Sequence, residues 1–237
     1  MRIRAGTTAA VLCAAALVAG CGGGGGSDAK PSAAASGTAA GDVEGTTASP
    51  SASGARAETL GEAQLKSAAL TGGDVDGYQV TDFPAKPDGD STARPAACQP
   101  LENMRTAAPD PGPQAFVGLL AFAGAGPAAG SATTVGLMAY DQPAAEGVLE
   151  GLRTALKECT AYEGGVPART TVTTAAAPDV GDEAVAFGLR TARDSADAFV
   201  VVRTGATVVL FSTASGTGAA AEVPDALISA QVRKLEA

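Results

Sequence analysis

Two stretches of the sequence decide the fold. Residues 183–189 read Glu-Ala-Val-Ala-Phe-Gly-Leu, and residues 198–211 read Ala-Phe-Val-Val-Val-Arg-Thr-Gly-Ala-Thr-Val-Val-Leu-Phe. The first stretch alternates large apolar residues with smaller ones, which is typical of a half-buried strand. In the second, Thr204-Gly205 separates two apolar runs by the length of a tight hairpin turn. We therefore predict an antiparallel meander with strands over 183–189, 198–203 and 206–211, preceded by a strand over 170–174.

The sequence on either side of the meander predicts helices and one hairpin. Residues 143–159 carry apolar side chains at i+3 and i+4 spacing along one stripe, and Pro143 suits a first helical turn. The runs 114–122 and 133–140 predict two strands joined by a Gly/Pro/Ala turn. Shorter segments predict a helix over 62–70, a strand over 78–83, one or two helical turns over 98–104, and a terminal helix from Pro224.

This order of elements defines the expected fold class. Helix, strand, hairpin, long helix, meander and helix together predict an α+β domain, in which helices pack on a mostly antiparallel sheet. The regular alternation that a doubly wound parallel sheet needs is absent. Residues 57–237 have the length of one domain and can bury a proper core.

The N-terminus predicts export and lipid attachment. Arg2 and Arg4 precede an apolar stretch of about 16 residues, too short for a membrane span but suited to a signal peptide over 1–20. The stretch ends in Leu17-Val-Ala-Gly-Cys21, which has the form of a bacterial lipobox. We expect cleavage before Cys21, lipidation of that cysteine, and anchoring on the extracytoplasmic face of the cell membrane. The alternative is an ordinary signal peptide, with Cys21 incidental.

Residues 21–56 predict a tether between the lipid and the domain. Five consecutive glycines are followed by Ser, Ala, Thr and Gly, with almost no large apolar residue. Such a composition cannot bury enough apolar surface to offset the entropy of ordering, so it favours disorder. The Thr and Ser residues around Pro50 are compatible with O-glycosylation or with a plain unmodified tether.

The cysteines predict one disulfide. Cys13 leaves with the signal peptide and Cys21 takes the lipid, so Cys98 and Cys159 remain. Two cysteines in an exported domain most simply pair with each other, although two free thiols or one reactive thiol are the alternative. A disulfide would pin the helix over 143–159 to the segment around Cys98.

Composition and charge exclude several classes of function. Removal of residues 1–20 takes away two arginines and no acid, which leaves 14 basic and 25 acidic side chains and a net charge of −11. Such a chain is a poor partner for nucleic acid, whose binding depends on phosphate neutralisation. The chain has no histidine, which excludes Ser-His-Asp and Cys-His catalysis and His-ligated metals, and two cysteines are too few for a zinc site. We predict a non-enzymatic protein without a cofactor or metal.

Two acidic motifs are weighed and set aside. A calcium-binding loop built on Asp74-Val-Asp-Gly77 would need a glutamate where Phe83 stands, so we predict a solvated turn. Asp182 and Glu183 are adjacent, but successive side chains on a strand point to opposite faces. We therefore expect these two carboxylates not to converge and interpret them as a turn leading into a strand.

Several segments, in this order, carry a resemblance to a known family. They are Leu65–Tyr78, Cys98-Gln-Pro-Leu101, the helix ending in Cys159, Val180-Gly-Asp-Glu-Ala-Val-Ala-Phe187, Val201–Val209, and a terminal helix with Leu227-Ile228 and Gln231. They cover most of residues 60–237. This region resembles the extracellular sensor domain of PknH-type actinobacterial receptor kinases, a domain that also occurs in free lipoproteins.

The resemblance implies an α+β fold with a cleft for an unidentified extracellular ligand. Members of the family often carry a second disulfide, which this chain cannot make. No catalytic residues transfer, the ligand-binding residues remain unknown, and the absence of a kinase segment implies that any sensing acts through another protein.

We therefore expect a membrane-anchored, sensor-like domain that binds an unidentified small ligand or envelope partner. One alternative is a structural or accessory envelope protein that acts through protein–protein contacts. Another is a carrier of a lipid or other apolar molecule, with the hairpin at 114–140 lining its cavity.

Overall fold

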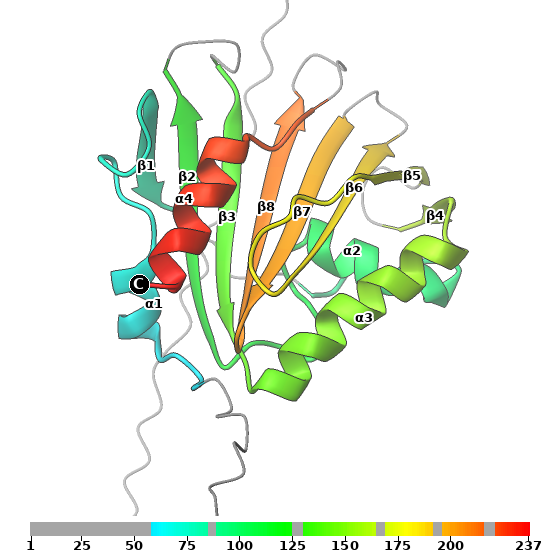
Figure 1. Cartoon of the computed structure of the whole chain (residues 1–237). Coiled ribbons are helices and arrows are strands. Elements are labelled where there is room, and N and C mark those ends of the chain that lie inside the picture. Colours follow the sequence, from blue (N-terminus) through cyan, green and yellow to red (C-terminus); the bar gives the residue numbers. More distant parts are fainter. Residues whose placement is uncertain (1–57, 85–88, 125–129, 165–168, 192–195, 216–220) are drawn as a thin grey trace, which may run out of the picture. The chain divides into compact units, whose positions relative to one another are not determined.

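The computed structural model describes residues 58–84, 89–124, 130–164, 169–191, 196–215 and 221–237, all within one compact unit (Figure 1). The expected signal peptide, Cys21 and the tether lie outside the described residues. The elements are α1 (Glu62–Ala68), β1 (Tyr78–Asp82), a short 3-10 helix η1 (Ala96–Cys98), α2 (Gln99–Arg105), β2 (Ala115–Ala123), β3 (Ala132–Ala139), α3 (Gln142–Glu158), β4 (Ala161–Glu163), β5 (Arg169–Ala175), β6 (Glu183–Thr191), β7 (Ala196–Thr204), β8 (Thr207–Ser215) and α4 (Asp225–Leu235).

The strands form one eight-stranded sheet in the order β1-β2-β3-β8-β7-β6-β5-β4. Every pair of neighbours is antiparallel. The strand β8 joins the β1–β3 half of the sheet to the β4–β7 half, because it pairs with β3 as well as with β7. The α+β fold predicted from the sequence, with a mostly antiparallel sheet, is therefore confirmed. Thr204 pairs with Thr207, so the hairpin turn is Gly205-Ala206, one residue later than predicted.

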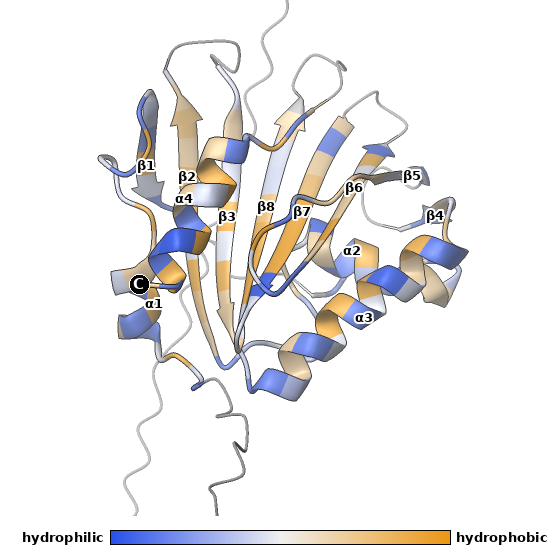
Figure 2. Ribbon diagram, viewed as in Figure 1, coloured by the Kyte–Doolittle hydropathy of each residue, from blue (hydrophilic) through white to orange (hydrophobic). Residues whose placement is uncertain are grey.

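Both faces of the central strands are buried. Along β7, Val200 and Val202 belong to the apolar cluster that includes α1 and α4, whereas Phe199 and Val201 belong to the cluster that includes α2 and α3. Helices therefore cover the sheet on both sides (Figure 1). Figure 2 shows the consequence in β7, whose middle is apolar without interruption.

The long helix α3 forms as its pattern predicts. The carboxylate of Asp141 caps it by accepting a hydrogen bond of 2.9 Å from the backbone N–H of Ala144. The predicted apolar stripe is buried, at Ala145, Val148, Leu149, Leu152 and Ala155. Cys159 ends the helix and is joined by a disulfide to Cys98, with a Cα–Cα distance of 5.7 Å.

Helix α1 is held to α4 by one buried amide. Gln231 is fully buried, its side-chain oxygen accepts from the N–H of Leu70 at 3.0 Å, and its nitrogen donates to the carbonyl of Ala68 at 2.7 Å. These bonds satisfy backbone groups at the end of α1 that the helix itself leaves unpaired. Among the described residues, no helix has the length and apolar character needed to cross a membrane.

Candidate functional site

A cleft of about 440 Å³ opens on the face of the sheet that α1 and α4 cover. Its floor comes from β6 and β7, one wall from the β5–β6 connection, and the other wall from the start of α4 and the residues before it. The lining residues are Ala175, Ala176, Ala177, Pro178, Val180, Ala186, Phe187, Ala198, Phe199, Val200, Ala221, Glu222, Val223, Asp225, Ile228 and Ser229.

The cleft exists because small side chains lie at its floor on a rigid support. Ala186 and Ala198 on the floor are too short to fill the space between the sheet and the β5–β6 connection. The rings of Phe187 and Phe199 stack at a centroid distance of 4.9 Å and are almost fully buried. Both rings belong to the apolar cluster on the other face of the sheet, so they support the cleft from beneath.

The β5–β6 connection is fixed by an arginine at its far end. Gly181 has a φ of +62°, and a Cβ there would lie 2.6 Å from the carbonyl oxygen of Arg203. The Arg203 guanidinium donates to Asp182 at 2.8 Å and to Glu183 at 2.8 Å. Asp182 also accepts from the N–H of Gly205 at 2.7 Å, so the connection is tied to the β7–β8 turn.

This cluster corrects one expectation and confirms another. Asp182 and Glu183 do converge, on Arg203, because Asp182 precedes β6 in the turn, where the alternation of a strand does not apply. The interpretation as a turn leading into a strand is confirmed. Burial acts to raise the pKa of Glu183, but hydrogen bonds from Arg203 and Arg153 outweigh it and hold the pKa below its usual value. Glu183 therefore stays charged, and both acids act as structural groups that hold Arg203.

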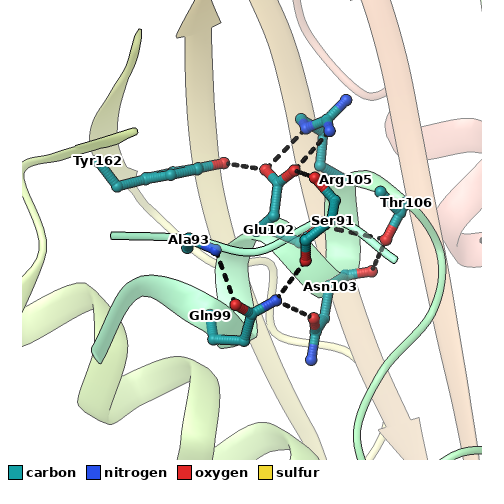
Figure 3. Close-up of polar contacts among 8 residues, drawn as sticks. All are labelled: Ser91, Ala93, Gln99, Glu102, Asn103, Arg105, Thr106 and Tyr162. Atoms are coloured by element: carbon teal, nitrogen blue, oxygen red, sulfur yellow. Dashed lines mark hydrogen bonds and ion pairs between the residues drawn. The ribbon is translucent and has the colours of Figure 1, made fainter. Parts of the chain in front are cut away.

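A second polar cluster lies on the α2 face of the sheet (Figure 3). Glu102 is fully buried and accepts hydrogen bonds from the Tyr162 hydroxyl at 2.8 Å, from Arg105 Nε at 2.8 Å, and from Ser91. Burial alone would raise the pKa of Glu102, yet these three donors lower it below its usual value. Burial and the bond to Glu102 raise the pKa of Tyr162.

The same cluster orders the chain ahead of α2. The Gln99 side chain accepts from the N–H of Ala93 at 2.8 Å and donates to the carbonyl of Ser91 at 2.9 Å and to Asn103 at 2.7 Å (Figure 3). Sequence analysis did not single out this cluster. The i, i+3 spacing of Glu102 and Arg105 was its one visible signal, since the partners Tyr162 and Ser91 are distant in sequence.

A smaller hollow of about 180 Å³ lies beside this cluster. Arg105 and Phe116 line it, but the charge of Arg105 is already matched by Glu102. The hairpin 114–140, which we expected to line a carrier's cavity, contributes Phe116, Thr134 and Gly136 here and no residue to the larger cleft. The larger cleft is therefore the better candidate for a binding site.

The remaining sequence motifs have structural roles or lie outside the described residues. Asp74 accepts from the N–H of Thr71 at 2.6 Å, which confirms the predicted turn, and from Lys234 at 2.7 Å, which ties that turn to α4 and was not predicted. Hydrogen bonds from Lys234 and then from Thr71 lower the pKa of Asp74 to about 2. Across the part of the chain that the structure describes, no three His, Cys, Asp or Glu side chains gather as metal ligands would.

Comparison with known proteins finds a similarity of fold. No protein-family model matches the chain, and no curated protein matches it in sequence. The disulfide-closed α+β domain is similar to the crystal structure of the extracellular domain of PknH from Mycobacterium tuberculosis, with a TM-score of 0.50 and 13% identity over 76% of this chain and 96% of that one. It also matches the X-ray structure of a putative uncharacterized protein (Rv0999 ortholog) from Mycobacterium smegmatis, with a TM-score of 0.38 and 19% identity over 77% and 99%. The predicted resemblance to the PknH sensor domain is thus confirmed at the level of the fold.

Proposed function

We propose that this protein is a lipid-anchored, extracytoplasmic binding protein whose cleft takes a small ligand without transforming it. The observation that carries the proposal is the cleft of about 440 Å³ between β6, β7, the β5–β6 connection and α4. Its volume falls within the range of small-molecule sites, and most of its lining residues have apolar side chains, with a few polar groups among them. The shared fold with an extracellular receptor domain favours the same interpretation.

The anchor in this proposal is Cys21. Bacterial lipoproteins carry a diacylglyceryl group on such a cysteine, and two acyl chains hold a protein stably to a bilayer. The 35 residues from Gly22 to Arg56 would give a flexible chain a span of roughly 30–35 Å, so the domain would act within a few nanometres of the membrane. We propose that the domain passes information to another envelope protein.

The cleft offers little to catalysis. Its ionisable lining residues are Glu222 and Asp225, both exposed, and the chain has no histidine to act as a general base near neutral pH. Glu183 follows the β5–β6 connection in sequence, but its carboxylate forms ion pairs with Arg203 and Arg153. A binding role therefore accounts for the site better than an enzymatic one.

The test is native mass spectrometry of the full-length protein, extracted from membranes of its exporting host with mild detergent. We expect a fraction that carries a small molecule in addition to the lipid anchor. In Ala198→Phe, whose ring would occupy the floor of the cleft, that mass should disappear. Ser229→Phe fills the cleft from α4 instead and serves where the first variant folds poorly. No ligand on the wild-type protein, or the same ligand on both filled variants, would overturn the proposal.

A further inference from the structure

The charged groups that line the cleft are of one sign. Glu222 and Asp225 are its ionisable lining residues, and no described lysine or arginine lines it. Both side chains are exposed, and neither forms an ion pair with any lysine or arginine that the structure describes. The rest of the lining is apolar apart from Ser229. The cleft thus combines an apolar floor with a rim that carries negative charge.

Local electrostatics leave this rim negative. Asp225 is the first residue of α4, where the partial positive charge of the helix N-terminus, about half a unit, offsets part of its charge. Glu222 precedes the helix and stands outside its first turn. The mature chain adds a net charge of −11, which draws cations toward its surface.

These observations select the chemistry of the occupant. An anion would meet two carboxylates, and a neutral apolar molecule would leave both of them without a function. A cation with an apolar body can lay that body on Ala186, Ala198 and Val200 and keep its charged group at the half-open rim. At the rim the charged group stays in contact with water, so the cost of desolvating a charge is small.

Resting on the proposed function, we propose that the ligand of this cleft is a small organic cation, an amine or quaternary ammonium compound with an apolar body. The carboxylates of Glu222 and Asp225 would attract its charge, and the hydroxyl of Ser229 can accept a hydrogen bond from an ammonium group. The floor residues would contact its apolar part.

Two probes with the same apolar body and opposite charge test this assignment. We would titrate the full-length, detergent-extracted protein with 3-phenylpropylamine and with 3-phenylpropanoate by calorimetry. We expect the amine to bind at least tenfold more tightly than the carboxylate, since one exposed charge contact contributes on the order of a fivefold gain for the amine and a similar loss for the anion. The preference should shrink as salt is added, because ions screen exposed charges.

The decisive variant is Glu222→Gln/Asp225→Asn. It should abolish the preference for the amine, whereas Glu150→Gln/Glu236→Gln, which removes the same charge at exposed positions outside the cleft, should retain it. Equal binding of the two probes, or a preference that survives Glu222→Gln/Asp225→Asn, would overturn the assignment of a cation.

The two proposals fail in different ways. Equal binding of both probes that is lost in Ala198→Phe would leave the cleft as a binding site with another ligand class. Failure of both probes to bind in the millimolar range, together with a ligand-free native mass, would overturn the binding function as well.

Discussion

Glu102 is a fully buried carboxylate, and its burial constrains the domain. A carboxylate taken out of water costs several kcal/mol unless nearby groups compensate for its charge. Three side chains donate hydrogen bonds to Glu102. Arg105 lies one turn further along α2, Ser91 lies in the chain before α2, and Tyr162 lies in β4. Because these donors come from three parts of the chain, they meet at Glu102 only in the folded domain, where they stabilise its buried charge.

The pKa of Glu102 therefore makes stability depend on pH. The folded-state pKa lies below the ordinary value of 4.5, so its contribution is fully present above about pH 4.5 and is lost as the pH falls through the folded value. Glu102→Gln should remove this acid sensitivity. It should also lower the free energy of unfolding at pH 7 by about 2–4 kcal/mol, because Arg105 loses its counter-ion. Urea denaturation at pH 7, 4 and 3 measures both effects.

The matched control for this change is Glu150→Gln on the exposed side of α3. It should leave both the stability at pH 7 and the acid sensitivity nearly unchanged, as surface substitutions usually do. Equal acid sensitivity in the wild type and in Glu102→Gln would show that Glu102 does not titrate as its contacts require.

At the scale of single residues, sequence predicted turns better than contacts. Asp74-Val-Asp-Gly77 was correctly interpreted as a turn because small and acidic residues have local conformational preferences. The convergence of Asp182 and Glu183 could not be derived in that way. It depends on Arg203, which lies 20 residues further along and reaches them only once β6 and β7 have paired.

At the scale of elements, the sequence predicted every helix and strand of five or more residues. The strands were recognised without a strict alternation, since helices cover both faces of the central sheet and favour apolar residues at successive positions. The strand β4 was missed because its three residues are too short for any periodicity. In the structure β4 pairs with β5 and forms one edge of the sheet.

The disulfide acts at this scale, because it fixes the end of α3 to the start of α2. Cys98 and Cys159 are both buried, and they close a loop of 61 residues. In the chain-entropy model such a loop contributes about 4 kcal/mol, since it limits the conformations of the unfolded chain. We expect Cys98→Ser to lower the free energy of unfolding by a few kcal/mol. Thermal melts with and without reductant provide the check, and identical melting temperatures would contradict a structural disulfide.

At the scale of the whole molecule, the candidate cleft shows where sequence reasoning stops. Its floor and walls come from residues 175–178, 180, 186–187, 198–200, 221–223, 225 and 228–229, and none of these segments carries a binding motif. The hollow exists because Ala186 and Ala198 become neighbours on the sheet while the β5–β6 connection passes above them. Small side chains in a sequence predict no cavity until pairing and connection are known.

In the proposed function the domain is attached to the membrane through lipid on one sulfur atom, that of Cys21. Cys21→Ser removes the nucleophile that would take the diacylglyceryl group, so the protein should either leave the membrane fraction or persist there as a precursor that retains residues 1–20. Cell fractionation and intact mass together distinguish these two results. Cys13→Ser changes a cysteine within the expected signal peptide and should yield the same lipidated mature protein as the wild type. A Cys21→Ser protein with the mature mass of the wild type, still in the membrane fraction, would show that something other than lipid on Cys21 holds the domain there.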